Sequence, residues 1–283
     1  MGHSCIAKEH RTEYVLQTEF DHFVKGAPFL RCFRDLLGQH GIFVADGDVW
    51  KRQRKMASHI FSVGNFKTYV QHTIHNDIDV LHSLLRDASS NSRDVNLCDI
   101  FFRFTMSTFS QMAFSANLQC LPGNVEDLKI RNEFADAFDY AQLVVDNRFV
   151  DPMPLFLEYF NRQGKRMRSC IKTLRSYCYR IIDLRLAAKQ SGEEKGAVDS
   201  KNGKDLLQLF VEMGLSREEL LPIVLNFLIA GRDTTAQSLS WAFYRFWQHP
   251  DVVSNIRQEV AEKLGDRKMV RRLSFSPSTL RTT

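Results

Sequence analysis

The sequence predicts a mainly α-helical protein, and three observations lead to this expectation. Hydrophobic residues make up 44% of the 283 residues and charged residues 25%, which is ordinary for a folded globular chain and excludes disordered and collagen-like proteins. Phenylalanine is abundant at 22 residues while glycine and proline number 14 and 7, a balance that suits long buried helices better than a turn-rich sandwich. Apolar residues also recur at helical spacing along much of the chain.

The first part of the chain predicts helices separated by short turns. Residues 11–40 have helical periodicity and end at Gly38 and Gly41, which indicate a stop or turn. A short strand-like run, Ile42 to Val44, follows. The elements expected next are a basic helix over about 48–60, a helix over roughly 66–88, a polar loop over 88–94 and an apolar, Phe-rich segment over 95–114.

The second part predicts longer helices. A helix of about 125–147 is expected before Pro152 and Pro154, then a long amphipathic helix of about 155–189. Residues 190–204 form a polar surface linker between helices. Ser216 and Glu219 match a capping box, and Pro222 is expected to separate a short first turn from a main helix ending near Trp247. A last helix should run to about Leu264.

Charge and cysteine patterns exclude several classes of function. Residues 266–283 hold five basic residues and one acidic residue, so residues 1–265 carry a net charge of only +1 out of the total of +5. We therefore expect no nucleic-acid partner, because such a partner needs basic residues on the folded part. The six cysteines form no C-x-x-C pair, which indicates a reducing compartment and no metal cluster. No stretch reaches the roughly 18–20 apolar residues that a transmembrane helix needs.

A polar group inside the apolar run 225–236 predicts a functional site. Glycine, aspartate and threonine are unfavourable within a helix, and such violations of local preference mark candidate sites. Gly231 would let a flat ligand approach the backbone. The Thr234 hydroxyl could bond back to the Ala230 carbonyl and widen the helix locally. Asp233 supplies a carboxylate that can pass protons inward, so the set predicts a proton-delivery groove.

Two motifs carry a resemblance to a known family. Ala230-Gly231-x-Asp233-Thr234-Thr235 resembles the oxygen-binding motif in the central helix of the cytochrome P-450 family of haem-thiolate monooxygenases. By that likeness Thr234 would steady dioxygen, Asp233 would relay protons, and Ala230, Gly231 and Thr235 would lie against the haem. Trp50 and Arg54, within Gly47 to Lys55, resemble the family's Trp-x-x-x-Arg helix and would bind the haem propionates. Trp50 and Arg54 could instead form a cation–π pair with each other at the surface.

The resemblance covers about Thr12 to Leu264 and implies a partial cytochrome P-450 fold, mainly α, through the central helix and the helix after it. It is nearest the fatty-acid terminal-hydroxylase branch, although Ser107 stands where that branch often has an acidic residue and Ser115 where a glycine is usual. The segments that look closest to this branch are Gly41 to Phe43, Phe101 to Thr105, Phe134 to Asp139 and Leu228 to Trp241.

Two further family signatures, a Glu-x-x-Arg pair and a cysteine-bearing haem loop, do not occur in these 283 residues, and all six cysteines precede residue 179. The sequence leaves the family pattern near Gly265, so residues 1–265 are expected to form a partial domain and 266–283 a divergent basic tail. The resemblance implies hydroxylation of a lipophilic substrate, such as a fatty acid, with haem iron, dioxygen and electrons from an NADPH-dependent reductase. Because the axial cysteine is missing, we expect a truncated, inactive product with doubtful haem occupancy.

Three further expectations follow from the same resemblance and from its gaps. Lys51, Arg52 and Lys55 would face the reductase, or form an ordinary solvated helix face. The alternative function is a non-enzymatic, haem-free fragment that binds lipid or a protein partner. The family resemblance implies the endoplasmic reticulum membrane if the protein is anchored, and otherwise a cytoplasmic or peripheral location.

Overall fold

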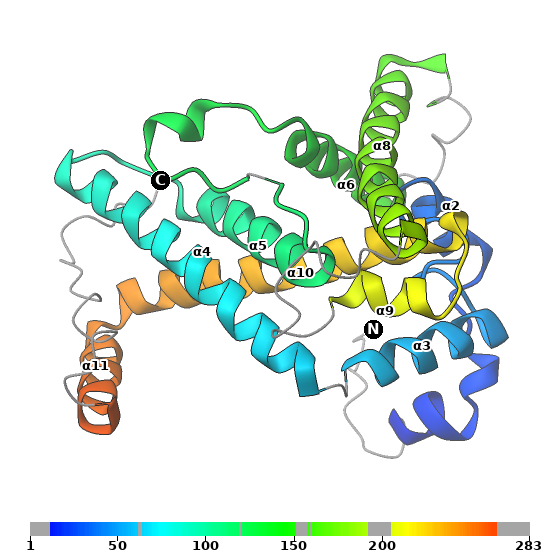
Figure 1. The fold of residues 1–283 in the computed structure, drawn as a ribbon, viewed down its shortest axis with the longest axis horizontal. Helices are drawn as coiled ribbons and strands as arrows, with labels where there is room; N and C mark the ends of the chain where they lie inside the picture. The colour runs from blue at the N-terminus through cyan, green and yellow to red at the C-terminus, as the bar shows by residue number, and fades with distance from the viewer. Residues whose placement is uncertain are drawn as a thin grey trace, which may run out of the picture. The chain divides into compact units, whose positions relative to one another are not determined.

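The computed structural model describes residues 12–61, 64–118, 120–150, 158, 160–191 and 205–264, and within these ranges the chain forms helices and turns without a strand (Figure 1). The predicted mainly α class is therefore confirmed. The elements are η1 (Tyr14–Thr18), η2 (Phe20–His22), α2 (Gly26–Leu37), α3 (Gly47–Phe61), α4 (Gly64–Ser90), α5 (Leu97–Phe114), η3 (Glu126–Lys129), α6 (Glu133–Val150), α8 (Arg162–Ser191), α9 (Leu206–Glu212), α10 (Arg217–Gln248) and α11 (Pro250–Leu264).

The chain divides into two compact units. The first contains Met1–Phe66, Asp136–Gly196 and Leu206–Phe227, and the second contains Lys67–Ala135, Ala197–Asp205 and Leu228–Thr283. The first unit therefore holds α2, α3, α8, α9 and most of α6, whereas the second holds α5, α11 and most of α4. Helix α10 contributes its beginning to the first unit and its larger part to the second.

In the first unit, one buried asparagine holds the turn that follows α2. Helix α2 ends at Gly38, whose φ of 76° is a conformation that glycine adopts without strain. The Asn226 amide of α10 donates to the Leu37 carbonyl at 2.8 Å and accepts from the Phe43 backbone N–H at 3.1 Å. The Asp46 carboxylate accepts from the backbone N–H groups of Lys25 and Gly26, both at 3.0 Å. The start of α2 therefore contacts the residue just before α3.

The expected strand at Ile42 to Val44 is wrong, because these residues form a turn. The Gly41 carbonyl accepts hydrogen bonds from Val44 at 2.9 Å and Ala45 at 2.8 Å, which closes the turn on itself. Val44 and Ala45 are buried all the same. The short apolar run that resembles a strand is thus explained by burial of these residues within a turn.

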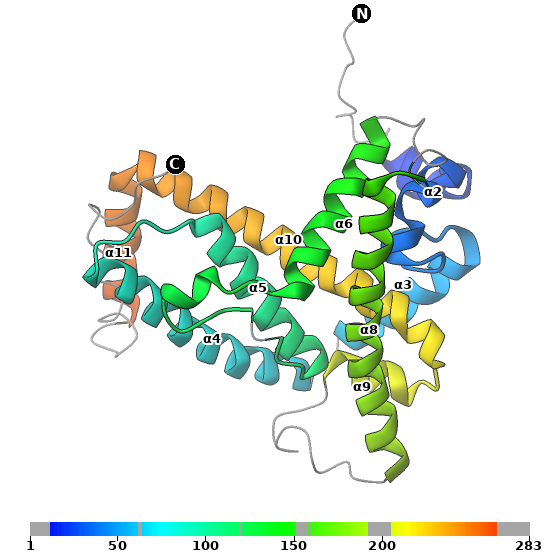
Figure 2. The ribbon, with the colours of Figure 1, turned by 90° about the horizontal axis from the view of Figure 1, so that it is seen from above.

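Helices α6 and α8 lie side by side in the first unit (Figure 2). The Arg166 guanidinium lies 3.9 Å from the centre of the Tyr140 ring, which ties the two helices together. Helix α8 begins at Arg162, where the Asn161 side chain accepts from the Gly164 N–H at 2.8 Å; the start expected near residue 155 falls among residues that the structure does not describe. Residues 151–157, together with Pro152 and Pro154, lie outside the described residues.

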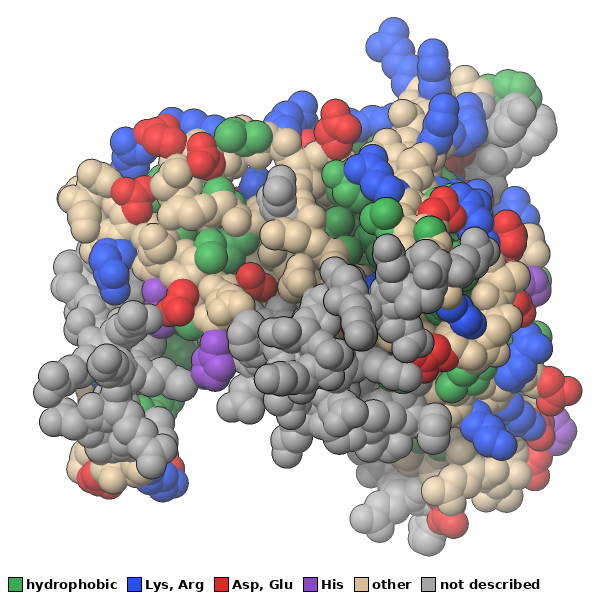
Figure 3. Space-filling model, viewed as in Figure 1, with side chains coloured by type: hydrophobic (Ala, Val, Ile, Leu, Met, Phe, Trp, Pro, Cys, Tyr) green, Lys and Arg blue, Asp and Glu red, His purple; other side chains and the backbone are tan. Residues whose placement is uncertain are grey.

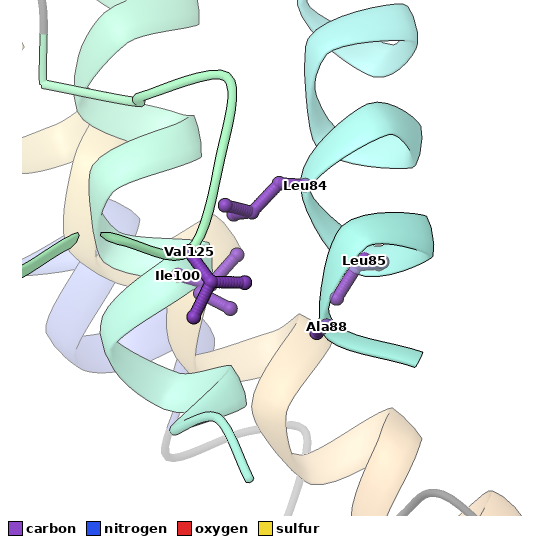
Figure 4. Packing of buried hydrophobic residues seen from close by; sticks show 5 residues of the cluster. All are labelled: Leu84, Leu85, Ala88, Ile100 and Val125. Atoms are coloured by element: carbon purple, nitrogen blue, oxygen red, sulfur yellow. The ribbon is translucent and has the colours of Figure 1, made fainter. Parts of the chain in front are cut away.

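In the second unit, a buried cluster joins α4, α5 and the segment before η3. Leu84, Leu85 and Ala88 of α4 face Ile100 of α5 and Val125, and all five are buried (Figure 4). Helix α5 ends at Ser115, which has a left-handed backbone with φ of 49° and ψ of 35°. This conformation explains why glycine is usual there in the family that the sequence resembles.

One helix start and the continuity of α10 differ from the sequence expectation. The helix expected over 125–147 begins only at Glu133, because the Asn132 side chain caps it by accepting from the Ala135 N–H at 3.0 Å; residues 126–129 form the 3₁₀ helix η3 instead. Pro222 does not divide α10, which is continuous from Arg217 to Gln248. Burial of Leu220, Leu221 and Ile223 around the proline offsets the backbone hydrogen bond that it cannot make.

None of the described helices has the length and hydropathy that crossing a membrane requires. Nearly all of the predicted linker over 190–204 and the whole of the predicted tail over 266–283 lie outside the residues that the structure describes.

Candidate functional site

The candidate site centres on the middle of α10, in the second unit, where buried and exposed residues alternate around the helix. Leu228, Arg232 and Ala236 are buried, whereas Thr234 and Thr235 are exposed and Ala230 is half-buried. Residues four apart share one side of a helix, so Ala230 and Thr234 form one strip and Leu228, Arg232 and Ala236 form another. The motif therefore presents its hydroxyl groups outward and anchors its opposite side in the unit.

The predicted bond of Thr234 is present. Its Oγ1 donates to the Ala230 carbonyl oxygen at 2.7 Å, and Ser238 repeats this arrangement one turn later by donating to the Thr234 carbonyl at 2.8 Å. The expected widening of the helix does not occur, because the backbone is α-helical at every residue from 217 to 248. The hydroxyl thus shares the Ala230 carbonyl with the helix and is held in one orientation on the exposed strip.

Asp233 is held by an arginine that the sequence reading left unassigned. Arg232 is buried, its Nη1 lies 3.2 Å from Asp233 Oδ1, and its guanidinium lies 4.6 Å from the centre of the Phe102 ring. A carboxylate paired with a buried guanidinium is held in a fixed position. Asp233 is accordingly a partly buried acceptor beside Thr234, fixed from the inner side of the helix.

Gly231 has a packing role. A Cβ atom added to this glycine would collide with the ring of Phe109 on α5, so the aromatic ring lies directly over the backbone at this point. The expectation that the missing side chain leaves an opening for a flat ligand is wrong on this side of α10, because Phe109 fills the space. Close contact between the two helices is sufficient to require a glycine here.

Thr105 of α5 is a positioning residue that the motif search missed. Its hydroxyl lies 3.0 Å from the Arg232 carbonyl oxygen and 2.9 Å from the carbonyl of Phe101 in its own helix. The hydroxyl has one proton, so it donates to these carbonyls in turn or shares it between them. Thr105 belongs to the Phe-Arg-Phe-Thr run that carried part of the family resemblance, so a signal existed but its role did not follow from the sequence.

Trp50 and Arg54 lie one turn apart on α3, in the first unit. The Trp50 ring packs against Phe20 with ring centres 5.2 Å apart, and the ammonium group of Lys25 lies 5.9 Å from its centre. The cation over the indole is therefore Lys25, which the sequence reading did not single out. Arg54 is exposed on the same helix. Its guanidinium is accessible to an anionic group that approaches α3, as the expected propionate contact requires.

The other basic residues of α3 differ in whether they form an ion pair or are simply exposed. Lys51 Nζ binds Asp21 Oδ1 at 2.9 Å, and this contact raises the pKa of the lysine. Lys51 is thus paired within its own unit, which reduces its availability for an external partner. Arg52 and Lys55 are exposed, as both the reductase-facing and the solvated interpretation expected.

The described residues fit haem only in part. An indole N–H, an exposed guanidinium and a helix with outward hydroxyl groups suit its carboxylates and its oxygen side. A cysteine that binds haem iron must be ionised. Burial has the opposite effect here, because it raises the pKa of the Cys178 thiol to about 12 and also raises that of Cys170. Cys120 accepts from the Asn132 amide at 3.5 Å, and Cys32 is buried near the Arg148 carbonyl. Within the described residues, no group of three or more His, Cys, Asp or Glu side chains could hold a metal ion.

Comparison with known proteins agrees with the motifs. The model of the family described as Cytochrome P-450 matches residues 5–277. The chain is 37% identical over 261 residues to the cytochrome P-450 monooxygenase cyp1 of Mycosarcoma maydis, covering 90% of this chain and 40% of that protein. It is 30% identical over 259 residues to cytochrome P-450 94A1 of Vicia sativa, covering 89% of this chain and 48% of that protein. The chain thus spans about half the length, or less, of these relatives.

Solved structures show the same fold. The crystal structure of a cytochrome P-450, CYP102L1, matches with a TM-score of 0.66 and 21% identity, covering 83% of this chain and 51% of that one. The haem domain of a cytochrome P-450DA mutant matches with a TM-score of 0.64 and 23% identity, covering 82% of this chain and 47% of that one. Both matches extend over most of the described helices, so the expectation of a partial fold of this kind is confirmed.

Proposed function

The chain belongs to the cytochrome P-450 family, and on this premise we propose that it supplies the oxygen-side helix and the propionate partners of a haem monooxygenase acting on a lipophilic substrate. The observation that carries the proposal is the Thr234 hydroxyl, which is held 2.7 Å from the Ala230 carbonyl on the exposed strip of α10. A fixed hydroxyl beside a carboxylate is the arrangement that proton delivery to a small bound molecule needs.

Each site residue has a proposed role. Haem, when bound, supplies the binding and reductive activation of dioxygen. Trp50 and Arg54 would hold its carboxylates through the indole N–H and the guanidinium. Thr234 would hold a proton at Oγ1, and Asp233, fixed by Arg232, would accept protons from solvent and return them. Ala230 and Thr235 would form part of the surface of the helix on which the ring lies, whereas Gly231 packs against Phe109.

The substrate and the electron donor are part of the same proposal. The resemblance of residues 101–105 and 134–139 to the fatty-acid terminal-hydroxylase branch supports a fatty acyl chain as substrate. Exposed Arg52 and Lys55 support the docking of an acidic surface on an NADPH-dependent reductase. On the same family grounds we propose the endoplasmic reticulum membrane if the protein is anchored, and otherwise a cytoplasmic or peripheral location.

We further propose that the chain by itself does not hydroxylate a fatty acid. Such chemistry needs an ionised cysteine on the iron, whereas Cys32, Cys120 and Cys178 are buried, burial raises the pKa of Cys170, and Cys98 is exposed at the beginning of α5. The test is the absorption spectrum of the chain with haem added, reduced and under carbon monoxide. We expect no thiolate-type Soret band, and such a band would show that one of these cysteines binds the iron.

The propionate contact has a test of its own. The replacement Arg54→Gln should weaken haem binding by about tenfold, since a hydrogen bond to a charged group contributes about 1.5–3 kcal/mol. Lys55→Gln, which removes a neighbouring exposed charge from α3, serves as the matched control and should leave haem binding unchanged. Haem titration followed by quenching of tryptophan fluorescence measures both. Equal affinity in the two variants would contradict the assignment of Arg54.

A second candidate function, binding of a lipid or protein partner without haem, is favoured by one observation. Trp241 and Trp247 on α10 are 64% and 51% exposed, and both rings contact Tyr244 between them. Exposed aromatic groups of this size often mark an interaction surface. Binding of dodecanoate by the haem-free chain that is lost on Trp241→Ser would support this candidate, and unchanged binding would oppose it.

A further inference from the structure

The first unit contains a cavity of about 570 Å³ whose walls come from α2, α6 and α8. Its volume lies within the range of about 300–1,000 Å³ that is usual for small-molecule sites. Its lining is unusually rich in charge. Five basic and two acidic side chains face it, a net charge of +3: Arg34, Arg148, Arg168, Lys172 and Arg175 against Asp35 and Glu158.

Arg148 is paired with both acids in the floor of the cavity. Arg148 is only 6% exposed, and its guanidinium binds Glu158 at 2.7 and 3.0 Å and Asp35 at 3.0 Å. It also donates to the Cys32 carbonyl at 2.8 Å. Burial alone would lower the pKa of Arg148, but the two carboxylates outweigh burial and raise it. The floor is therefore a fixed ion network that gives the ligand no spare positive charge.

The backbone around this floor is closely packed. A Cβ atom added to Gly164 would collide with the backbone carbonyl of Glu158, so the first turn of α8 lies directly against the residue that holds Arg148. Met167 and Ile171, one and two turns further along α8, are buried and provide an apolar wall. Tyr179 and Ser176 add hydroxyl groups to the lining. The cavity thus has a rigid charged floor and one apolar side.

The remaining cations form the rim, and most of them come from one helix. Arg168, Lys172 and Arg175 are spaced by four and three residues, so they project from one side of α8. Figure 3 shows Lys and Arg side chains gathered over this helix. Lys172 makes no hydrogen bond or ion pair with any residue that the structure describes, and Arg175 makes only a long contact of 3.4 Å to the Asp35 carbonyl.

The positive charges of Lys172 and Arg175, at the rim of a cavity of ligand size, attract an anion. Guanidinium and ammonium groups recognise carboxylate and phosphate oxygens through charge-assisted hydrogen bonds. We propose that this cavity binds a small ligand through its carboxylate or phosphate group, with Lys172 and Arg175 as the contacts and the Met167–Ile171 wall beside an apolar part of the ligand. None of its lining residues belongs to α3 or α10, the helices that carry the proposed haem contacts.

The proposal is tested by isothermal titration of the haem-free chain with two probes, inorganic phosphate and dodecanoate. The double variant Lys172→Gln/Arg175→Gln should weaken binding by about tenfold or more, because two charge-assisted hydrogen bonds are lost. Arg180→Gln is the matched control, since Arg180 is exposed on the same helix and does not line the cavity. Lys172→Arg, which keeps the charge, should retain the affinity and shows that loss does not reflect misfolding.

The probes also separate the two ligand chemistries. Binding of phosphate that depends on the rim cations supports a site for free phosphate or a phosphate headgroup, and binding of dodecanoate alone supports a carboxylate amphiphile. Equal affinity of the double variant and Arg180→Gln for the probes, or no binding of either probe, overturns the proposal. Because no haem is present, either result leaves the roles proposed for Thr234 and Arg54 unaffected.

Discussion

At the scale of single residues, Asn226 illustrates how one polar side chain can hold a whole segment. It is fully buried, and its amide makes three hydrogen bonds to backbone groups of Leu37, Phe43 and Pro222. The replacement Asn226→Leu removes the side-chain partner of the Leu37 carbonyl and the Phe43 N–H, which costs about 1–3 kcal/mol for each group that finds no water. We therefore expect a large fall in the free energy of unfolding, measured by urea denaturation.

The control for Asn226 is Asn91→Leu, because Asn91 also bonds to backbone but is exposed on the surface. Its loss should change stability by about 1 kcal/mol or less. If both replacements had the same small effect, the turn at 38–46 would not depend on Asn226.

The cysteines should differ in reactivity according to burial. The Cys178 thiol is fully buried and its pKa is raised to about 12, so almost none of it is ionised at neutral pH. Cys98 is exposed at the start of α5. A thiol reagent applied to the folded chain should modify Cys98 first and Cys178 only after unfolding, as mass spectrometry of the labelled peptides would show. Early labelling of Cys178 would mean that α8 opens readily.

At the scale of elements, helix α10 is held against α5 by close backbone contact. The replacement Gly231→Ala removes a residue that is about 1 kcal/mol worse than alanine within a helix, yet it forces a methyl group into the ring of Phe109. Overpacking of this kind costs typically about 1–3 kcal/mol, so the net effect should be destabilising. Thermal denaturation followed by circular dichroism measures the change.

Gly123→Ala is the matched control, because a Cβ atom at Gly123 would meet nothing within 4 Å. Its effect on the melting temperature should be small. A Gly231→Ala protein as stable as the original would show that Phe109 can rotate away, and the expected opening beside the helix would then be available after all.

The sequence predicted helix ends well where a local side chain signals them and poorly where several signals compete. The Ser216 cap of α10 is confirmed, with the Glu219 carboxylate 2.9 Å from the Ser216 N–H. The start of α6 was misplaced because asparagine at position 132, and not the residues after Gly123, caps that helix. Asn96 and Asn161 cap α5 and α8 in the same manner. Asparagine is among the strongest N-cap residues, so these three starts were readable in principle.

The candidate site was predicted in part for a similar physical reason. The Thr234 bond is local, four residues back along one helix, and was predicted correctly. Lys25 above Trp50, Thr105 against Arg232 and Phe109 over Gly231 join residues far apart in the chain. Such contacts depend on how helices pack, and a single sequence carries no periodic signal for them.

At the scale of the whole molecule, several carboxylates couple stability to pH. The Arg217 side chain lowers the pKa of Asp183, the Ser216 backbone N–H lowers that of Glu219, and Lys129 with Arg93 lowers that of Glu126. A carboxyl group whose pKa is lower in the folded state contributes stability above its unfolded pKa of about 4, and this contribution is lost as the pH falls through the folded value. We expect the free energy of unfolding to decline below about pH 4.

Urea denaturation at a series of pH values from neutral to acid measures this decline. Asp77 acts in the opposite sense, because burial raises its pKa and its protonated form favours the folded state as the pH falls. The double variant Asp183→Asn/Glu219→Gln should show a shallower decline than the original chain. An identical pH profile would assign the acid sensitivity to other carboxylates.

The hydrogen bonds of Asp46 and Asn226 restrict how residues 25–46 can move. Asp46 joins the base of α2 to the residues that lead into α3, and Asn226 joins the far end of α2 to the beginning of α10. Residues 25–46 are therefore held at two points and should move as one rigid unit. A small sliding of α10 along its axis would pull on Leu37 and Phe43 and, through Asp46 and Lys25, shift the indole of Trp50.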